Sequence, residues 1–235
     1  MPIKGYQGTS LLDFPGRIAS LVFFSGCNLS CPFCHNPDLL FDVDRLPDIP
    51  PDELIAELQT RRNFIDGVVV TGGEPTLDPE LEPFLRQVKE LGLLTKLDTN
   101  GLAPLVLERL LGDELVDFVA LDLKTSPERY GELHNHPVGL ASLERSIQLL
   151  LSGTIPYELR TTCVPGYIAE QDIHRLGQRA AGAERWVLQQ FVAGHALREE
   201  CRNLLPYPVE RIRQLGAVAA EYVADVSFRG ITGGL

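Results

Sequence analysis

Short apolar runs alternate with amphipathic segments along the whole chain. Runs rich in β-branched and apolar residues predict six strands, over Ile18–Phe24, Gly67–Val70, Leu94–Leu97, Phe118–Leu121, Tyr157–Cys163 and Trp186–Phe191. Between and after these runs, apolar residues recur at helical spacing. This spacing predicts helices over Pro51–Phe64, Asp78–Leu91, Ala103–Leu111, Leu140–Leu151, Ile168–Ala181 and Val209–Tyr222.

The order of these elements indicates an α/β fold. Repeated strand-then-helix units imply a parallel sheet whose crossovers are right-handed. About six units are too few for a closed eight-stranded barrel, but enough for an open parallel sheet flanked by helices, either doubly wound or a partial barrel. No linker-like change in composition divides the chain, so we expect a single domain over residues 1–235.

Composition narrows the class of protein. The 235 residues are 44% apolar, which suits an ordinary folded core. No run of roughly eighteen apolar residues predicts a membrane span, and the opening MPIKGYQGTS lacks the apolar region of a signal peptide. We therefore expect a cytoplasmic protein with reduced cysteines and no membrane association. A net charge of −11 without any long basic run argues against a nucleic-acid partner.

Glycines and polar residues gather just after the predicted strands. TGGEP (71–75) follows the second strand, DTNG (98–101) the third and DLK (122–124) the fourth, while Arg160 lies in the fifth. In parallel α/β folds, the loops at the carboxyl ends of the strands build the active site. These segments are therefore predicted to converge on one site.

The loop after the first strand carries the most informative residues. Cys27, Cys31 and Cys34 are spaced C-x3-C-x2-C. Iron–sulfur cubanes commonly take four thiolates, so three would leave one iron open to an outside chelating ligand. The alternative is a structural zinc ion with His35 as its fourth ligand, although ligands adjacent in sequence are awkward to turn onto one ion.

The remaining cysteines and several histidines are given no role in the chemistry. Cys163 lies in an apolar strand and is expected to be buried. Cys201 stands alone in the polar stretch REECRN and is expected to be exposed, so we predict one cluster only. His134, His136 and His174 are interpreted as surface polar residues.

The cysteine motif, with Phe33 before its last cysteine, resembles the signature of the radical S-adenosylmethionine (SAM) enzymes. CPFCHNPD and the upstream DFPGR (13–17) are similar to the glycyl-radical-enzyme activases, which activate pyruvate formate-lyase and anaerobic ribonucleoside-triphosphate reductase. The similarity continues through TGGEP, DTNG, DLK and VPG. The opening GYQGTSLLDFPGRIA together with LQQF most resembles the reductase-activating branch.

This resemblance implies a radical SAM partial (β/α)6 barrel and an oxidoreductase activity. Cys27, Cys31 and Cys34 would bind one 4Fe–4S cluster whose open iron takes the amino and carboxylate groups of S-adenosylmethionine. One electron, from a low-potential donor such as flavodoxin or ferredoxin, would release a 5′-deoxyadenosyl radical. That radical would take a hydrogen atom from a glycine of a large partner, in this branch anaerobic ribonucleoside-triphosphate reductase.

The resemblance also assigns residues around the cofactor. The implied cofactor-binding set is Phe33, Asn36, Gly72, Gly73, Glu74, Asp98, Asp122, Lys124 and Arg160. The two glycines would let the backbone approach the ligand closely and Glu74 would accept from its ammonium group, although a tight turn into a helix is the simpler interpretation.

A small monovalent cation is implied beside the cofactor. Asp98, Thr99 and Asp122 match the positions where the activases gather oxygen ligands around it. Two neighbouring aspartates repel one another unless a cation or a lysine lies between them, and Lys124 is a candidate for that lysine. For Asp98–Gly101 a plain Asx-type turn, and for Arg160 a helix-facing salt bridge, stay open as alternatives.

Two other functions remain open from the sequence. One is a radical SAM enzyme acting on a small molecule, similar to 7-carboxy-7-deazaguanine synthase. The other is a zinc-binding module with no enzymatic activity.

Overall fold

The computed structural model describes residues 2–134, 139–153 and 155–231. Of the predicted surface histidines, His136 lies outside the described residues. The chain forms two compact units. The N-terminal unit comprises Met1–Asn28, Asp38–Thr99 and Ala103–Ala120, and the C-terminal unit comprises Leu29–Pro37, Asn100–Leu102 and Leu121–Leu235. That the two units together form a single domain stays a prediction.

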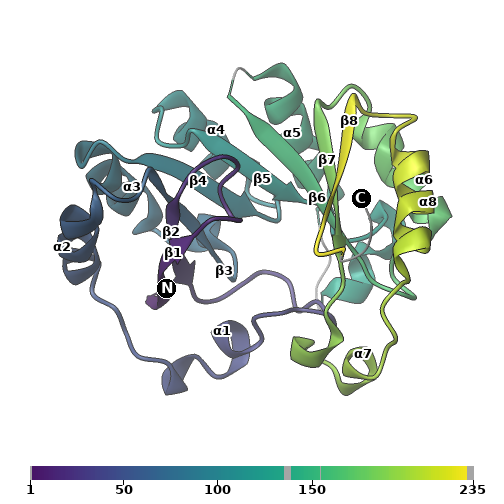
Figure 1. Ribbon diagram of the computed structural model, residues 1–235, viewed down its shortest axis with the longest axis horizontal. Helices are drawn as coiled ribbons and strands as arrows, with labels where there is room; N and C mark the ends of the chain where they lie inside the picture. Colours follow the sequence, from purple (N-terminus) through teal and green to yellow (C-terminus); the bar gives the residue numbers. More distant parts are fainter. Residues whose placement is uncertain (1, 135–138, 154, 232–235) are drawn as a thin grey trace. The chain divides into compact units, whose positions relative to one another are not determined.

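The six predicted strands are all present, and two further strands flank them (Figure 1). The hydrogen-bonding order follows the sequence, from β1 to β8. The strands are β1 (Ile3–Ser10), β2 (Ala19–Phe24), β3 (Gly67–Gly72), β4 (Leu94–Thr99), β5 (Phe118–Asp122), β6 (Tyr157–Cys163), β7 (Arg185–Gln190) and β8 (Asp225–Arg229). This order confirms the predicted open α/β sheet.

One strand departs from the predicted parallel sheet. β1 pairs with β2 in antiparallel orientation, with Tyr6 opposite Val22. Only a short loop joins the two strands, and a parallel neighbour would need a crossover of a dozen or more residues. β2–β3, β3–β4, β6–β7 and β7–β8 are parallel, so the sheet is mostly rather than wholly parallel.

The six predicted helices are also present, with small differences at their ends. They are α2 (Pro51–Arg61), α3 (Leu81–Glu90), α4 (Pro104–Gly112), α5 (Leu140–Ser152), α6 (Glu170–Ala180) and α8 (Val209–Ala219). The short helices α1 (Asp38–Phe41) and α7 (Glu199–Arg202) were not predicted, nor were the 3-10 helices η1 (Val43–Arg45), η3 (Pro127–Leu133) and η4 (Ala193–His195). The 3-10 helix η2 (Pro75–Leu77) agrees with the alternative interpretation of TGGEP as a tight turn into a helix. α2 and α4 begin at prolines, whose missing N–H would have no partner in a first helical turn.

In the N-terminal unit, apolar side chains from the strands and the β1–β2 loop pack into a buried cluster. Its members are Phe14, Ala19, Leu21, Val69 and Phe118. α2 and α3 lie next to one another in the blue part of the chain (Figure 1). Packing of this kind fixes the strands, and therefore fixes where the loops after them begin.

In the C-terminal unit, α6 and α8 lie side by side (Figure 1). Gly177 of α6 faces the ring of Tyr222 so closely that a Cβ at this position would come within 2.3 Å of the ring. Trp186 of β7 is fully buried, and its Nε1 donates to Thr161 Oγ1 of β6 at 3.0 Å.

No helix among the described residues combines the length and the apolar character that crossing a membrane requires.

Candidate active site

In the N-terminal unit, the loops after β2 and β3 leave the same edge of the sheet. Phe24 of β2 lies opposite Gly72 of β3. Beyond these residues, Gly73 N donates to Phe24 O and Glu74 N donates to Gly26 O, both at 2.8 Å. The TGGEP segment therefore packs directly on the backbone that precedes Cys27.

The glycines of TGGEP are required by this contact. Gly72 has φ of +118°, and a Cβ there would lie 2.3 Å from Phe24 O. A Cβ on Gly73 would lie 1.9 Å from Gly26 O. The structure shows close approach of the chain itself at these glycines, and the close approach of a ligand stays a prediction. Gly72 and Gly73 therefore position the start of the cysteine loop.

Glu74 links the same loop to the end of β4. Its side chain is buried, and Oε1 accepts from Thr76 N at 3.2 Å and from Thr76 Oγ1 at 2.5 Å. The same oxygen accepts from Thr99 Oγ1 at 2.7 Å. The loop after β3 and the last residue of β4 are thereby held together by one carboxylate oxygen.

Asp98 has a partner that the sequence analysis did not identify. Lys96 lies two residues earlier on β4, so the two side chains share one face of the strand. The Lys96 ammonium pairs with Asp98 Oδ1, its side chain has no exposed surface, and its Nζ lies 5.8 Å from the centre of the Phe118 ring. The sequence signal was a lysine inside an apolar strand, followed by an aspartate at i+2.

The Asx turn considered for DTNG is present, and Asn100 supplies its side-chain oxygen. Asn100 Oδ1 accepts from Leu102 N at 3.0 Å. Gly101, which follows Asn100, has φ of +75°.

In the C-terminal unit, Asp122 is held between two cations. Arg160 Nε donates to its Oδ1 and Lys124 Nζ donates to its Oδ2, each at 2.8 Å. Burial alone would raise the pKa of Asp122, but the charges of Arg160 and Lys124 outweigh burial and lower the pKa. For Lys124 the directions are reversed. Burial alone would lower the pKa of its ammonium group, but the negative charge of Asp122 outweighs burial and raises the pKa. Arg160 is thus paired with an aspartate at the end of a neighbouring strand.

The segment with Cys31 and Cys34 is anchored by backbone hydrogen bonds within the C-terminal unit. Ser30 N donates to Leu133 O, and Arg198 N donates to Pro32 O, both at 2.9 Å. Cys34 N donates to Cys31 O at 2.9 Å and closes the turn between the two thiols. Cys31 is buried, and it is close enough to Lys124 to contribute to the raised pKa of that lysine.

Aromatic rings flank this cysteine segment. Phe33 is buried and meets the ring of Tyr167 edge-on, with centroids 5.0 Å apart. The His35 ring stacks on Phe191 at 5.9 Å. The His35 residue is exposed, but partial desolvation by its neighbours, and then the charges of Lys124 and His195, lower its pKa and favour the neutral form. Asn36, the next residue, is partly buried.

All five cysteines lie among the described residues and are thiols, none of them in a disulfide. Cys163 is fully buried, as predicted, and burial raises its pKa to about 12. Cys201 is also buried, contrary to the expectation from its polar sequence neighbours. Within the described residues, no three His, Cys, Asp or Glu side chains are gathered around one metal position. Cys27 belongs to the N-terminal unit, and Cys31 and Cys34 to the C-terminal unit, so their joint role as cluster ligands stays a prediction. Reduced thiols at this spacing are the donor set that iron–sulfur clusters use.

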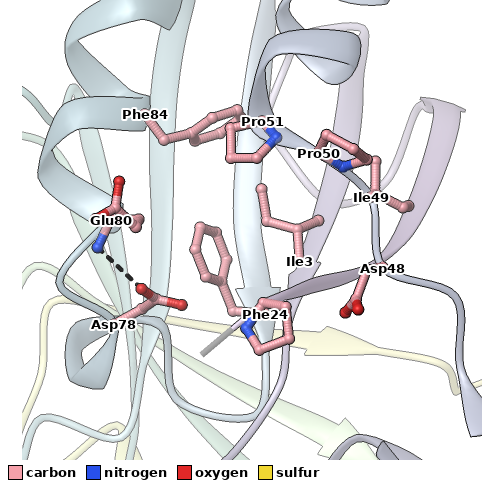
Figure 2. A pocket seen from close by; sticks show the side chains of 10 residues that line it. Ile3, Phe24, Asp48, Ile49, Pro50, Pro51, Asp78, Glu80 and Phe84 are labelled. Atoms are coloured by element: carbon pink, nitrogen blue, oxygen red, sulfur yellow. Dashed lines mark hydrogen bonds between the residues drawn. The ribbon is translucent and has the colours of Figure 1, made fainter. Parts of the chain in front are cut away.

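The N-terminal unit also contains a pocket of about 310 Å³ that includes none of the predicted site residues. Figure 2 shows Ile3, Phe24 and Phe84 facing into it. Asp78 Oδ1 lies at its edge and accepts from Glu80 N at 2.9 Å (Figure 2). The pocket thus has an apolar lining with carboxylates beside it, and the predicted chemistry lies elsewhere.

Comparison with known proteins agrees with the cysteine motif and the fold. Residues 21–176 match the model of the radical SAM superfamily. The chain therefore belongs to that superfamily, whose members use a 4Fe–4S cluster and S-adenosylmethionine.

Similar proteins identify the family within this superfamily. The chain is 32% identical, over 98% of its length and 97% of the relative's, to MJ1227 of Methanocaldococcus jannaschii, which is named as a glycyl-radical enzyme activating enzyme. It is 32% identical to the pyruvate formate-lyase 1-activating enzyme of Escherichia coli K12, over 75% of this chain and 73% of that protein. Within the superfamily, the chain belongs to the glycyl-radical-enzyme activating family.

Solved structures share the fold. Streptococcus suis SuiB bound to its precursor peptide SuiA superposes with a TM-score of 0.67 at 18% identity, covering 91% of this chain and 48% of SuiB. A domain of the pyruvate-formate lyase-activating enzyme of Bacteroides vulgatus gives a TM-score of 0.53 at 18% identity, covering 72% of this chain and 99% of that domain. The chain spans about half the length of SuiB.

Proposed function

We propose that this chain is a radical SAM activase that installs a glycyl radical on a partner enzyme, namely anaerobic ribonucleoside-triphosphate reductase. The observation that carries the proposal is the 32% identity to a named activating enzyme over nearly the full length of both chains. Similarity over the whole length is stronger support than a cysteine motif alone, because the motif is common to the superfamily.

In this proposal Cys27, Cys31 and Cys34 hold the cluster. When bound, the cluster and S-adenosylmethionine supply a one-electron cleavage that gives methionine and 5′-deoxyadenosine, whose added hydrogen atom comes from a glycine Cα of the partner. That glycine keeps the unpaired electron. The electron comes from a low-potential donor, for which we propose a flavodoxin or a ferredoxin.

The chain's own residues prepare the site before any cofactor arrives. Asp122, Lys124 and Arg160 form a fixed set of charges in the same unit as Cys31. Because these charges are already paired and oriented, they need little reorganisation when the charged cofactor binds. We propose that Lys124 and Arg160 face the cofactor's carboxylate while Asp122 keeps both in place.

Apolar surroundings favour the same chemistry. Phe33 and Tyr167 pack edge-on beside the cysteine segment, and Phe191 covers one face of the His35 ring. Cys31 and Phe33 are buried, so these rings shield part of the cysteine segment from water. We propose that His35 acts as a neutral hydrogen-bonding group near the cluster and not as its ligand.

The choice of partner rests on the opening of the chain. GYQGTSLLDFPGRIA covers most of β1, the loop after it and the start of β2, and LQQF covers the end of β7 and Phe191. These segments resemble the reductase-activating branch more than the pyruvate formate-lyase branch.

An anaerobic spin-resonance experiment tests the proposal. The reconstituted protein is mixed with S-adenosylmethionine, a reductant and either anaerobic ribonucleoside-triphosphate reductase or pyruvate formate-lyase from the same organism. We expect a glycine-centred doublet in the electron paramagnetic resonance spectrum with the reductase, and 5′-deoxyadenosine in equal amount. A variant outside the proposed site serves as a control for the effect of mutation itself. Asp225→Ala, which removes an exposed carboxylate of the C-terminal unit, should give the same doublet as wild type.

Other results point to the other functions. Formation of 5′-deoxyadenosine without a doublet on either partner would favour a small-molecule substrate. A colourless protein that holds one zinc ion after anaerobic reconstitution would refute both enzymatic proposals.

A further inference from the structure

We propose that Lys96 takes the place of the monovalent cation expected beside Asp98, so that this enzyme needs no alkali-metal ion. The inference rests on the proposed function for the identity of the site. The contact that it concerns is the pair of Lys96 and Asp98. The effect of that pair on stability and cofactor binding can be measured without enzymatic turnover.

The contact between the two side chains carries the proposal. Lys96 has no exposed side-chain surface, and its ammonium pairs with Asp98 Oδ1, whose side chain is only 10% exposed. A lysine is rarely buried in this way unless it is paired. The ammonium therefore supplies one positive charge at the carboxylate where the family resemblance places a cation.

An ammonium group is a suitable substitute for such a cation. It is a compact single positive charge, and it binds oxygen atoms through its three N–H donors. The Phe118 ring lies with its centroid 5.8 Å from Nζ, close enough for a cation–π contact. The strand backbone fixes the position of Lys96 two residues before Asp98, so the charge is present before the cofactor binds.

The second carboxylate assigned to the cation is also neutralised by the chain. Arg160 and Lys124 bind the two oxygens of Asp122 in the C-terminal unit. Each of the two aspartates thus has a protein cation within its own unit. Lys96 is accordingly a positioning residue, which holds Asp98 in one orientation.

The test asks whether removal of the ammonium creates a requirement for potassium. The thermal unfolding of the full-length protein, without its cluster, is followed in potassium chloride and in tetramethylammonium chloride at equal ionic strength. Wild type should unfold at the same temperature in both salts. Lys96→Met should unfold at a lower temperature, and potassium should raise its midpoint by about 2 to 4 °C over tetramethylammonium.

The reconstituted enzyme provides a second measurement. Binding of S-adenosylmethionine to Lys96→Met should weaken by about tenfold or more in tetramethylammonium chloride and recover in potassium chloride. Lys96→Arg should bind the cofactor in both salts. These measurements do not involve the partner, so they separate a failure of this inference from a failure of the proposed function.

Two variants control for effects that are merely structural. In Lys96→Met/Asp98→Asn both charges are absent, and potassium should have no specific effect. Lys89→Met removes the partner of Asp117, a half-buried pair in the same unit, and should also show no potassium effect.

Should Lys96→Met fail to fold in tetramethylammonium, the test is whether potassium alone restores folding. Equal behaviour of Lys96→Met in the two salts, or a potassium requirement in wild type, would overturn the proposal.

Discussion

At the scale of single residues, two glycines decide how the cysteine loop begins. Gly73 lies against Gly26 O, and Glu74 N donates to that same oxygen. Gly26 itself has φ of +75°. The residue before Cys27 is thus in a conformation suited to glycine and is covered by a segment that also requires glycine.

Replacement of Gly73 by alanine should disrupt the start of the cysteine loop. The new Cβ would lie 1.9 Å from Gly26 O, and backbone on both sides would have to move. We expect a loss of about 2 kcal/mol or more in the free energy of unfolding, measured by urea denaturation, together with reduced iron binding.

Gly112→Ala is the matched control for this prediction. Gly112 is the last residue of α4, and a Cβ there would meet nothing within 4 Å. This substitution should leave iron binding unchanged and should not destabilise the protein. Equal iron binding by both variants would show that the Gly73 contact does not shape the loop.

At the scale of elements, one buried carboxylate joins η3 to the start of α6. Asp172 is fully buried, and its Oδ2 accepts from Ala169 N at 2.9 Å. Its Oδ1 accepts from Ser126 Oγ at 2.6 Å, and Arg129 lies 3.7 Å away. The first turn of α6 is therefore fixed to the segment that follows the DLK motif.

Replacement of Asp172 by alanine should loosen this junction. It removes an N-terminal cap and leaves the buried Ser126 hydroxyl without its acceptor. We expect a loss of about 2 to 4 kcal/mol in the free energy of unfolding, read from urea denaturation. Asp225→Ala, which breaks the exposed pair with Arg185, should change it by no more than about 0.5 kcal/mol. Similar losses in the two variants would contradict the assigned role of Asp172.

The elements themselves were largely predictable, and the exceptions have a physical cause. Each of β2 to β7 contains a run of three or more buried residues, mostly apolar or β-branched, and such runs give a strong sequence pattern. β1, with the sequence IKGYQGTS, contains two glycines and several polar residues. β8, with the sequence DVSFR, is short and charged. Edge strands of this kind lack the apolar pattern by which a strand is predicted.

The residues of the candidate site were predictable only in part. The cysteines and the strand-end loops were identified by their spacing and position. The role of Gly73 was not, because its neighbour Gly26 is distant in sequence. Lys96 was passed over because a lysine in a strand usually points to solvent, and only the fold shows that this one is buried. Contacts between distant segments are what the sequence alone does not specify.

At the scale of the whole molecule, the number and environment of the cysteines set the number of clusters. Cys163 and Cys201 are both buried, and burial raises the pKa of each. We expect about four iron and four sulfide ions per chain after anaerobic reconstitution, measured by chemical analysis.

Cysteine variants separate cluster ligands from other thiols. Cys31→Ala should lose the cluster and all formation of 5′-deoxyadenosine, whereas Cys163→Ala should retain both. About eight iron ions per chain, or turnover by Cys31→Ala, would contradict the assignment.

The charged edge strand β8 offers little to another polypeptide. β8 is an edge strand of five residues with Asp225 at one end and Arg229 at the other. Asp225 pairs with Arg185, which lies opposite it on the neighbouring strand β7. A foreign strand that hydrogen-bonded along this edge would have to desolvate these charges. Self-association by edge-to-edge pairing is thereby discouraged, so the protein can be concentrated for spectroscopy with little tendency to form fibrils.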